Sequence, residues 1–443
     1  MRRDDVVEAI RTVLRDHLRN RHLHLFGPEA RLNEDLYLDS ILMLEVFLQL
    51  ELSFGLSVPD HVMTSRELAT VADLAGLFAE GEAAPPAAPE PPPGSVHGEE
   101  YVDIKVHCFV SSVCDAVKRT PGIDHRPFYF GVWDADFAVG DGTPGREWTL
   151  LYHAPSISHD FFRHWFRRLY GPEVREWYDR TRSKAENLET LLDLVETRPD
   201  TLSVMAMVDL HHLPERENKF NQNPFPHYLM LETSADPEAF FVSDPDFRWE
   251  GEIAKDKIVN AFLQPTVAGG FAFDRADIHP PAAADLKAYF EACFHPDANP
   301  LTAAVRRIVA GHLAGHPSEM GGRTPADLVT ALRELPVISI RKYAYEHGFA
   351  FFWRALGLPD ETFLVHCDEI EELIQGFKAL HYAVLRLAET GDTGLAGDIF
   401  ERLDRLDELE FGIKASLGAV FRSWCAANGL RCDHHLRDAE VAR

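Results

Sequence analysis

The sequence predicts a multidomain protein, in which a small all-α bundle over residues 1–80 precedes an α+β domain over 100–275 and a mostly helical C-terminal part over 276–443. Three observations predict this order. Residues 81–99 are rich in proline and alanine and lack apolar bulk, which is typical of an extended linker. The segment after the linker mixes strand and helix patterns. The last segment shows almost only helical periodicity.

The N-terminal segment carries a serine at the start of an apolar helix. Ser40 follows Asp39 and begins a stretch in which Leu44 and Phe47 recur at helical spacing. Free N–H groups and the helix dipole at such a start favour a phosphate. A second amphipathic stretch at 67–80 has the character of a bundle's last helix. Taken alone, the Asp39-Ser40 pair is equally interpretable as a simple helix cap.

The run RLNEDLYLDSILML, followed by LSVPD, resembles the acyl carrier protein family, with DSI in place of the family's DSL. It is similar in particular to the aryl carrier proteins of petrobactin-type siderophore assembly. The resemblance implies a four-helix carrier bundle in which Ser40, next to Asp39, bears covalent 4′-phosphopantetheine attached by a phosphopantetheinyl transferase. An acyl or aryl group is then held as a thioester. In such assembly a separate aryl transferase passes 3,4-dihydroxybenzoyl to a primary amine of spermidine.

The second segment contains alternating strand and helix patterns. Helices are predicted over 106–120, 159–171 and 183–200. Strand-like runs, rich in β-branched and aromatic residues, occur at 128–137, 148–154, 201–210, 227–233 and 239–247. This mixture of patterns predicts an α+β domain.

A cysteine stands at the start of the first predicted helix of this segment. In Val106-His107-Cys108-Phe109, the positive end of the helix dipole favours the thiolate, which is the nucleophilic form of cysteine. Cys114 lies deeper in the same helix and is expected in the core. Cys108 by itself is also interpretable as a small buried hydrophobe.

A histidine and an aspartate belong to two consecutive predicted strands. His227 opens the first strand and Asp244 closes the second. If Leu231 faces Phe240, His227 lies directly opposite Asp244, where Cβ atoms are roughly 4.5–5.5 Å apart. A carboxylate there orients the imidazole and stabilises its protonated form. Singly, His227 fits a buried strand position and Asp244-Pro245 a turn, but together with Cys108 they predict a catalytic triad.

The order Cys, His, Asp, with the cysteine on a helix and the others on adjacent strands, is that of papain-like (cysteine-peptidase-like) folds. The segments HC, VDLHHLP, HYLML and VSDPDF resemble the butirosin-type acyltransferases, which transfer an acyl group from a carrier protein to an amine. The resemblance implies an amide-forming acyltransferase with Cys108, His227 and Asp244 as catalytic residues. Direct attack by the amine without a covalent Cys108 intermediate remains open. So do two other functions, a thioesterase-type hydrolase and a non-catalytic docking module.

The net charge of −27 disfavours partnership with nucleic acid or an anionic membrane. It suits a cationic acceptor such as a polyamine, although charge alone is more simply interpreted as serving solubility. Candidate acidic contacts for that amine are Asp134, Asp136 and Asp209. Aromatic residues at 128–133 and 161–165 are expected either to line an aryl pocket or, more simply, to form core.

Other features narrow the class of protein further. Apolar runs are too short to span a membrane, the N-terminus lacks the pattern of a signal peptide, and six scattered cysteines fit a reducing cytoplasm. The histidines at 211–212 and 434–435 lack zinc-site spacing, so no metal is expected. A Walker or Rossmann glycine loop is also absent from the sequence, which implies that an external adenylating acid ligase loads Ser40.

Overall fold

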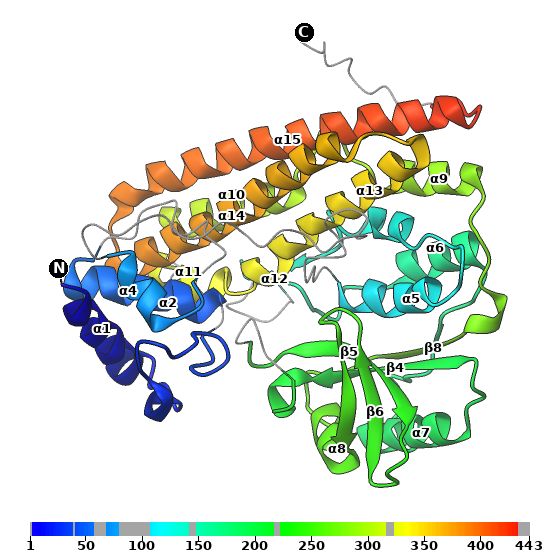
Figure 1. Cartoon of the computed structure of the whole chain (residues 1–443), viewed down its shortest axis with the longest axis horizontal. Coiled ribbons are helices and arrows are strands. Elements are labelled where there is room, and N and C mark those ends of the chain that lie inside the picture. The colour runs from blue at the N-terminus through cyan, green and yellow to red at the C-terminus, as the bar shows by residue number, and fades with distance from the viewer. Residues whose placement is uncertain are drawn as a thin grey trace.

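The computed structural model describes residues 2–38, 40–56, 68–78, 107–140, 148–216, 222–315 and 323–432, with only the backbone at positions 40 and 41. Asp39 and the predicted linker at 81–99 lie outside the described residues. The described chain forms a helical N-terminal part, a central α+β sheet domain and a helical C-terminal part (Figure 1). The predicted multidomain order is therefore confirmed at this level. A four-helix carrier bundle and a papain-like fold remain predictions.

The N-terminal part is a small helical unit with its own hydrophobic core. Val6, Leu36, Val46 and Leu74 are among the buried residues that build this core. Thr70 caps the last described helix, because its hydroxyl accepts from the backbone N–H of Asp73 while Asp73 accepts from Thr70. The elements are α1 (Arg3–Thr12), its π-helical continuation η1 (Val13–His17), η2 (Leu23–Leu25), α2 (Ser40–Phe54) and α4 (Val71–Gly76).

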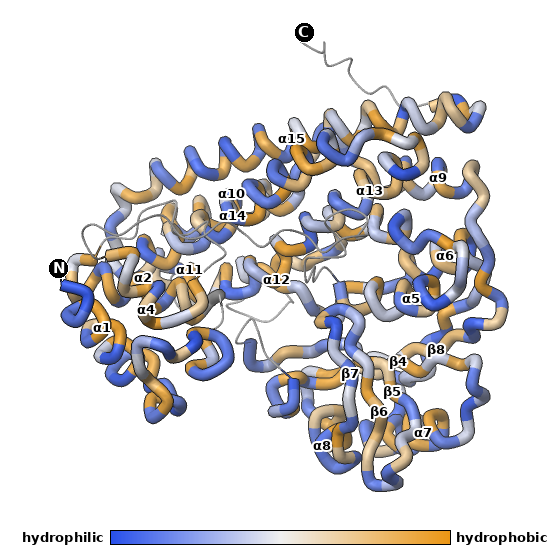
Figure 2. Tube along the Cα trace, viewed as in Figure 1, coloured by the Kyte–Doolittle hydropathy of each residue, from blue (hydrophilic) through white to orange (hydrophobic). Residues whose placement is uncertain are grey.

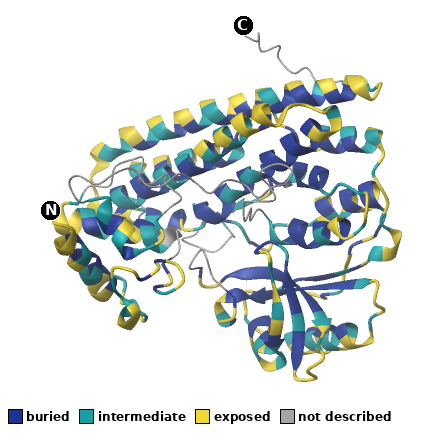
Figure 3. Ribbon diagram, viewed as in Figure 1, coloured by how far each residue is buried: buried dark blue, intermediate teal, exposed yellow. Residues whose placement is uncertain are grey.

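The central domain is built on a six-stranded antiparallel sheet in the order β3-β8-β4-β5-β6-β7. Its middle strands are almost wholly buried and appear dark blue in Figure 3, which explains why their sequences are near-continuous apolar runs. The strands are β3 (Arg175–Glu176), β4 (Leu202–Asp209), β5 (Pro226–Thr233), β6 (Ala239–Asp244), β7 (Trp249–Ala254) and β8 (Gly270–Asp274).

Helices cover both faces of this sheet. On one side α5 packs on β5, and on the other α7 and α8 pack on β4 (Figure 1). A capping box between Ser183 and Glu186 fixes the start of α7. The remaining elements of the domain are α5 (Cys108–Lys118), η4 (Arg126–Gly131), β1 (Ala138–Val139), β2 (Leu150–Leu151), α6 (Asp160–Tyr170), α7 (Lys184–Thr197), η5 (Leu210–His212), α8 (Lys255–Phe262) and η6 (Arg275–Asp277).

The prediction of a strand at 128–137 is wrong. Residues of this run form the end of the 3₁₀ helix η4 and a following turn, and Phe128, Phe130 and Trp133 are buried in the main core. The aromatic residues that raised the strand propensity instead pack against α9 and α13. Phe162 and Trp165 are buried in the same core, as the simpler interpretation expected, whereas Phe161 is 39% exposed.

The C-terminal part is helical, and its two longest helices, α14 and α15, run along each other (Figure 1). In Figure 2 apolar residues recur along these helices, as burial of one stripe requires. No described helix combines the length and apolar character needed to cross a membrane. The elements are α9 (Ala283–Cys293), α10 (Pro300–Ala314), η7 (Pro325–Asp327), α11 (Leu328–Ala331), α12 (Leu335–Ser339), η8 (Ile340–Tyr343), α13 (Ala344–Leu356), α14 (Asp360–Thr390), η9 (Thr393–Leu395) and α15 (Ala396–Ala427).

Candidate active site

Cys108 is the first residue of α5, as the sequence predicted. The helix start is tied to the turn after β6, because Asp246 Oδ1 accepts from the backbone N–H of His107 at 3.1 Å and from the hydroxyl of Ser111 at 2.7 Å. His107 is the N-cap residue, and its Nδ1 accepts from the N–H of Val110 at 3.5 Å. These contacts fix where the Cys108 thiol stands.

The predicted pairing of the hairpin is wrong by two residues. Leu231 faces Val242 rather than Phe240. A shift of two positions leaves every side chain on its predicted face, because side chains alternate with a period of two along a strand. His227 and Asp244 therefore still meet, on a diagonal, with Nε2 3.0 Å from Oδ1.

Asp244 is completely buried and has several partners. Its Oδ2 accepts from Nη2 of Arg216 at 2.6 Å, and its Oδ1 also accepts from the N–H of Phe247 at 3.2 Å. The Arg216 guanidinium lies over the Trp249 ring, 4.4 Å from its centroid. Asp244 is thus held rigidly in the orientation that contacts His227, whereas no sequence pattern pointed to Arg216.

The charges around His227 favour its protonated form. Burial alone would lower the pKa of His227, but the carboxylate of Asp244 and the sulfur of Cys108 outweigh it and hold this pKa well above its ordinary value. Because Asp244 engages Nε2, Nδ1 is the ring nitrogen that remains for the sulfur. By contrast, burial and the Arg341 charge lower the pKa of His107, which stays neutral.

These residues open into a cavity of about 800 Å³ between the sheet domain and the C-terminal helices. This volume is in the range of pockets that bind small organic molecules. Cys108, His227 and Tyr152 line the cavity from the sheet side, and Val337 and Arg341 line it from the helical side. The cavity is therefore complete only when both parts of the chain are present.

Arg341 brings a buried positive charge to this cavity. Its side chain is held by the main-chain oxygens of Ala135 (3.3 Å), Asp136 (2.9 Å) and Tyr152 (3.5 Å). Arg341 is only 6% exposed, yet no carboxylate of the described residues forms an ion pair with it. A buried guanidinium without an acidic partner favours an anion in the cavity that it faces.

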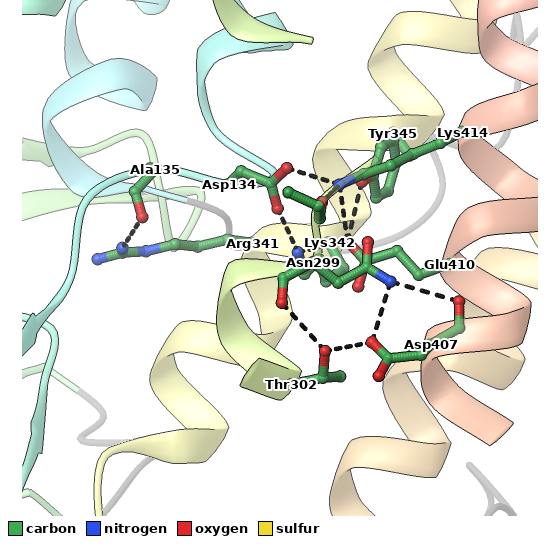
Figure 4. A network of polar contacts seen from close by, with 11 residues as sticks. Asp134, Ala135, Asn299, Thr302, Arg341, Lys342, Tyr345, Asp407, Glu410 and Lys414 are labelled. Atoms are coloured by element: carbon green, nitrogen blue, oxygen red, sulfur yellow. Dashed lines mark hydrogen bonds and ion pairs between the residues drawn. The ribbon is translucent and has the colours of Figure 1, made fainter. Parts of the chain in front are cut away.

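The residue next to Arg341 belongs to a buried network of ion pairs (Figure 4). Lys342 Nζ donates to Asp134 Oδ1 at 2.7 Å and to Glu410 Oε1 at 2.6 Å, and Lys414 Nζ donates to Asp134 Oδ2 at 2.8 Å. All four side chains are at most 5% exposed. The network joins the sheet domain to η8 and α15, and it anchors the backbone that carries Arg341.

The acidic residues suggested as amine contacts do not lie at the cavity. Asp134 belongs to the ion-pair network, and Asp209 accepts from the N–H groups of His211 and Phe225. Asp136 does not line the cavity either. The carboxylates that do line it are those of Asp160, Glu176, Asp246 and Glu334. Asp246 belongs to the quoted segment VSDPDF, whereas Asp160, Glu176 and Glu334 lie outside the quoted motifs and are revealed only by the fold.

Ser40 is the first residue of α2, a helix of 15 residues. A phosphodiester at this position would meet the free N–H groups of the helix start, so the backbone fits the predicted prosthetic group. Asp39 lies outside the described residues. Among the residues that are described, no three His, Cys, Asp or Glu side chains form a group suited to a metal ion.

Comparison with known proteins gives matches for both ends of the chain. Family models described as the DUF6005 N-terminal domain and the DUF6005 C-terminal domain match residues 103–278 and 284–437. Petrobactin synthase of Bacillus anthracis is 40% identical over 321 residues, which are 72% of this chain and 95% of that protein. Acyl carrier protein AsbD of Bacillus anthracis is 28% identical to the N-terminal region over 80 residues, 18% of this chain and 88% of that protein. The chain therefore belongs to the DUF6005 family and is a homologue of petrobactin synthase, with a region similar to an acyl carrier protein at its N-terminus.

Proposed function

We propose that this protein is an acyltransferase of siderophore biosynthesis that transfers an aryl group, as dihydroxybenzoyl, from its own carrier domain to a primary amine of a polyamine such as spermidine. One observation carries the proposal. A cavity lined by Cys108 and His227 is present in a chain whose parts match petrobactin synthase and an acyl carrier protein. The contact between His227 and Asp244 supports acyl-transfer chemistry there.

In the proposed reaction Cys108 is the nucleophile. The imidazolium of His227 stabilises the thiolate, which attacks the thioester carbonyl and forms a new C–S bond. The old C–S bond breaks, and His227 gives its proton to the departing thiolate of the arm, which leaves as a thiol. Arg341 and the backbone N–H groups at the start of α5 would stabilise negative charge on the carbonyl oxygen. The product of this half-reaction is an aryl group on Cys108.

The second half-reaction uses the neutral imidazole that the first one leaves. The amine attacks the carbonyl on Cys108, His227 removes the proton of the attacking nitrogen, and the C–S bond breaks to regenerate the thiolate. Asp244 and Arg216 hold the ring in place throughout. Carboxylates at the cavity, Asp160 and Glu176 among them, would hold the remaining ammonium groups of a polyamine.

Ser40 would carry 4′-phosphopantetheine, whose thiol supplies the thioester linkage. A phosphopantetheinyl transferase and an external adenylating acid ligase are the partners that this arrangement needs. The position of Ser40 at the start of α2 fits the attachment of a phosphodiester.

The test uses the full chain, charged on Ser40 with a dihydroxybenzoyl group by a phosphopantetheinyl transferase. Spermidine is added, and mass spectrometry follows both the small-molecule product and the mapped peptides that contain Ser40 and Cys108, because transfer within one chain leaves the intact mass unchanged. We expect a dihydroxybenzoyl amide of spermidine, and without spermidine an aryl group on Cys108. The Cys108→Ala variant, loaded equally well, should lose amide formation.

The outcomes separate the competing functions. Free acid without amide would mean a hydrolase. Unchanged product formation by both Cys108→Ala and His227→Ala would mean a non-catalytic docking module. If Cys108→Ala still transfers and no aryl enzyme accumulates in the parent chain, the covalent route is wrong and the amine attacks the carrier thioester directly.

A further inference from the structure

The N-terminal helical unit is seated on α14 through one carboxylate, that of Glu51 in α2. The hydroxyl of Tyr382 donates to Glu51 Oε2 at 2.5 Å, and Arg386 Nη2 lies 3.1 Å from Glu51 Oε1. Both carboxylate oxygens are thus held by α14. Because Tyr382 and Arg386 are four residues apart, they lie on one face of that helix.

Apolar packing accompanies these polar contacts. The Tyr382 ring is only 7% exposed and belongs to the hydrophobic core of residues 2–78, although it comes from a helix more than 300 positions away in sequence. Leu385 packs against the same core. The side chain of Glu51 is 15% exposed, so its charge is partly desolvated and depends on its two partners. Tyr382, Leu385 and Arg386 are called the α14 face below.

The contact also contains an unfavourable element. Glu45 of α2 and Glu389 of α14 carry like charges, and after burial the charge of Glu389 is the next cause that raises the pKa of Glu45. Like charges weaken a contact that would otherwise be tight. The contact is therefore suited to a unit that docks and is released again.

The helix that holds this unit also supports the cavity wall. α14 contacts α11, α12 and η8. These three elements contribute Thr330, Val337 and Arg341 to the lining of the cavity. The N-terminal unit thus contacts α14, and α14 in turn contacts the three elements that line the cavity at Cys108.

We propose that the α14 face is a docking surface for an acyl carrier domain, which it recognises by the acidic Glu51 on α2. The relatives add a second reason. In Bacillus anthracis the proteins similar to the two parts of this chain are separate, and they match different regions here. A fused chain keeps both partners together, so the contact seen within it is the one that a free carrier would make with its transferase.

Charge reversal in the full chain tests the proposal without relying on catalysis. Small-angle X-ray scattering measures the radius of gyration of the apo protein and of Glu51→Arg, Arg386→Glu and the double variant. Each single variant places like charges together, so the carrier should leave α14 and the radius of gyration should rise. The double variant restores an ion pair of opposite polarity and should return most of the way to the parent value.

Arg422→Glu is the matched control. Arg422 lies in the last turns of α15, whose end is on the opposite side of the molecule from α2 (Figure 1). This variant should scatter like the parent chain, and thermal unfolding checks that all variants are folded. Single variants that scatter like the parent, or a double variant no more compact than the singles, would overturn the proposal. If the single and double variants scatter as expected but the parent chain forms no amide, the proposed function is wrong and the docking proposal stands.

Discussion

At the scale of single residues, two cations face the sulfur of Cys108. His227 is kept protonated by Asp244, and Arg341 is buried without an acidic partner among the described residues. In the proposed reaction both would stabilise the attacking thiolate, and they come from different parts of the chain. The sequence predicted the first cation, because His227 and Asp244 flank a recognisable hairpin. It did not predict Arg341, because one arginine in a helical region has no distinctive pattern.

The thiolate can be measured by the pH dependence of Cys108 alkylation with iodoacetamide. In Asp244→Asn the loss of the carboxylate lowers the pKa of His227, so less imidazolium is present at neutral pH. The midpoint of the alkylation profile should therefore move to higher pH, because less imidazolium stabilises the thiolate. Arg341→Met should move it in the same direction, and Arg341→Lys less.

Arg333→Met is the control for this measurement. Arg333 lines the same cavity but is exposed to solvent, where its charge is screened. The alkylation midpoint of Arg333→Met should match that of the parent chain. Peptide mapping assigns the alkylated cysteine. If neither Asp244→Asn nor Arg341→Met moves the midpoint, the thiolate is not maintained by these charges.

At the scale of elements, physical reasons explain which strands and pairings the sequence predicted correctly and which it did not. The buried strands β4, β5 and β6 were predicted well, because long apolar runs bounded by turns leave few alternatives. Pairing within the β5–β6 hairpin was wrong by two residues because such a slip keeps every side chain on its face. The run at 128–137 was wrong because its aromatic residues satisfy tertiary packing rather than a strand. Contacts between distant elements, such as that of Lys414 with Asp134, leave no local signal.

Because of the buried network, we expect the loss of a charge on α15 to lower stability by an amount that depends on whether the charge is buried. Lys414→Met leaves Asp134 and Glu410 with a single cation between them, and an uncompensated buried charge costs about 3–5 kcal/mol. Urea unfolding followed by tryptophan fluorescence should show a much lower midpoint. Arg402→Met on the same helix removes a partly exposed i,i+4 ion pair with Asp398 and should lower the midpoint much less. Equal midpoints for the two variants would mean that the network contributes no more than a surface pair.

At the scale of the whole molecule, the fusion determines how often the carrier meets the cavity. A covalent linker of moderate length maintains an effective concentration near the millimolar range. The docking contact of Glu51 with Tyr382 and Arg386 raises the local occupancy further. Delivery within one chain should thus greatly exceed delivery between chains at micromolar protein.

Mixing two inactive chains tests this expectation. Ser40→Ala has no attachment point for the arm, and Cys108→Ala keeps the arm but lacks the proposed nucleophile, so only delivery between chains can form product in the mixture. At about 1 μM protein the mixture should form amide at least 100-fold more slowly than the parent chain, given a roughly millimolar effective concentration within one chain. The rate per chain should rise with protein concentration in the mixture and stay constant for the parent. A mixture as fast as the parent would show that the carrier serves the cavity of another molecule, and each variant alone provides the blank.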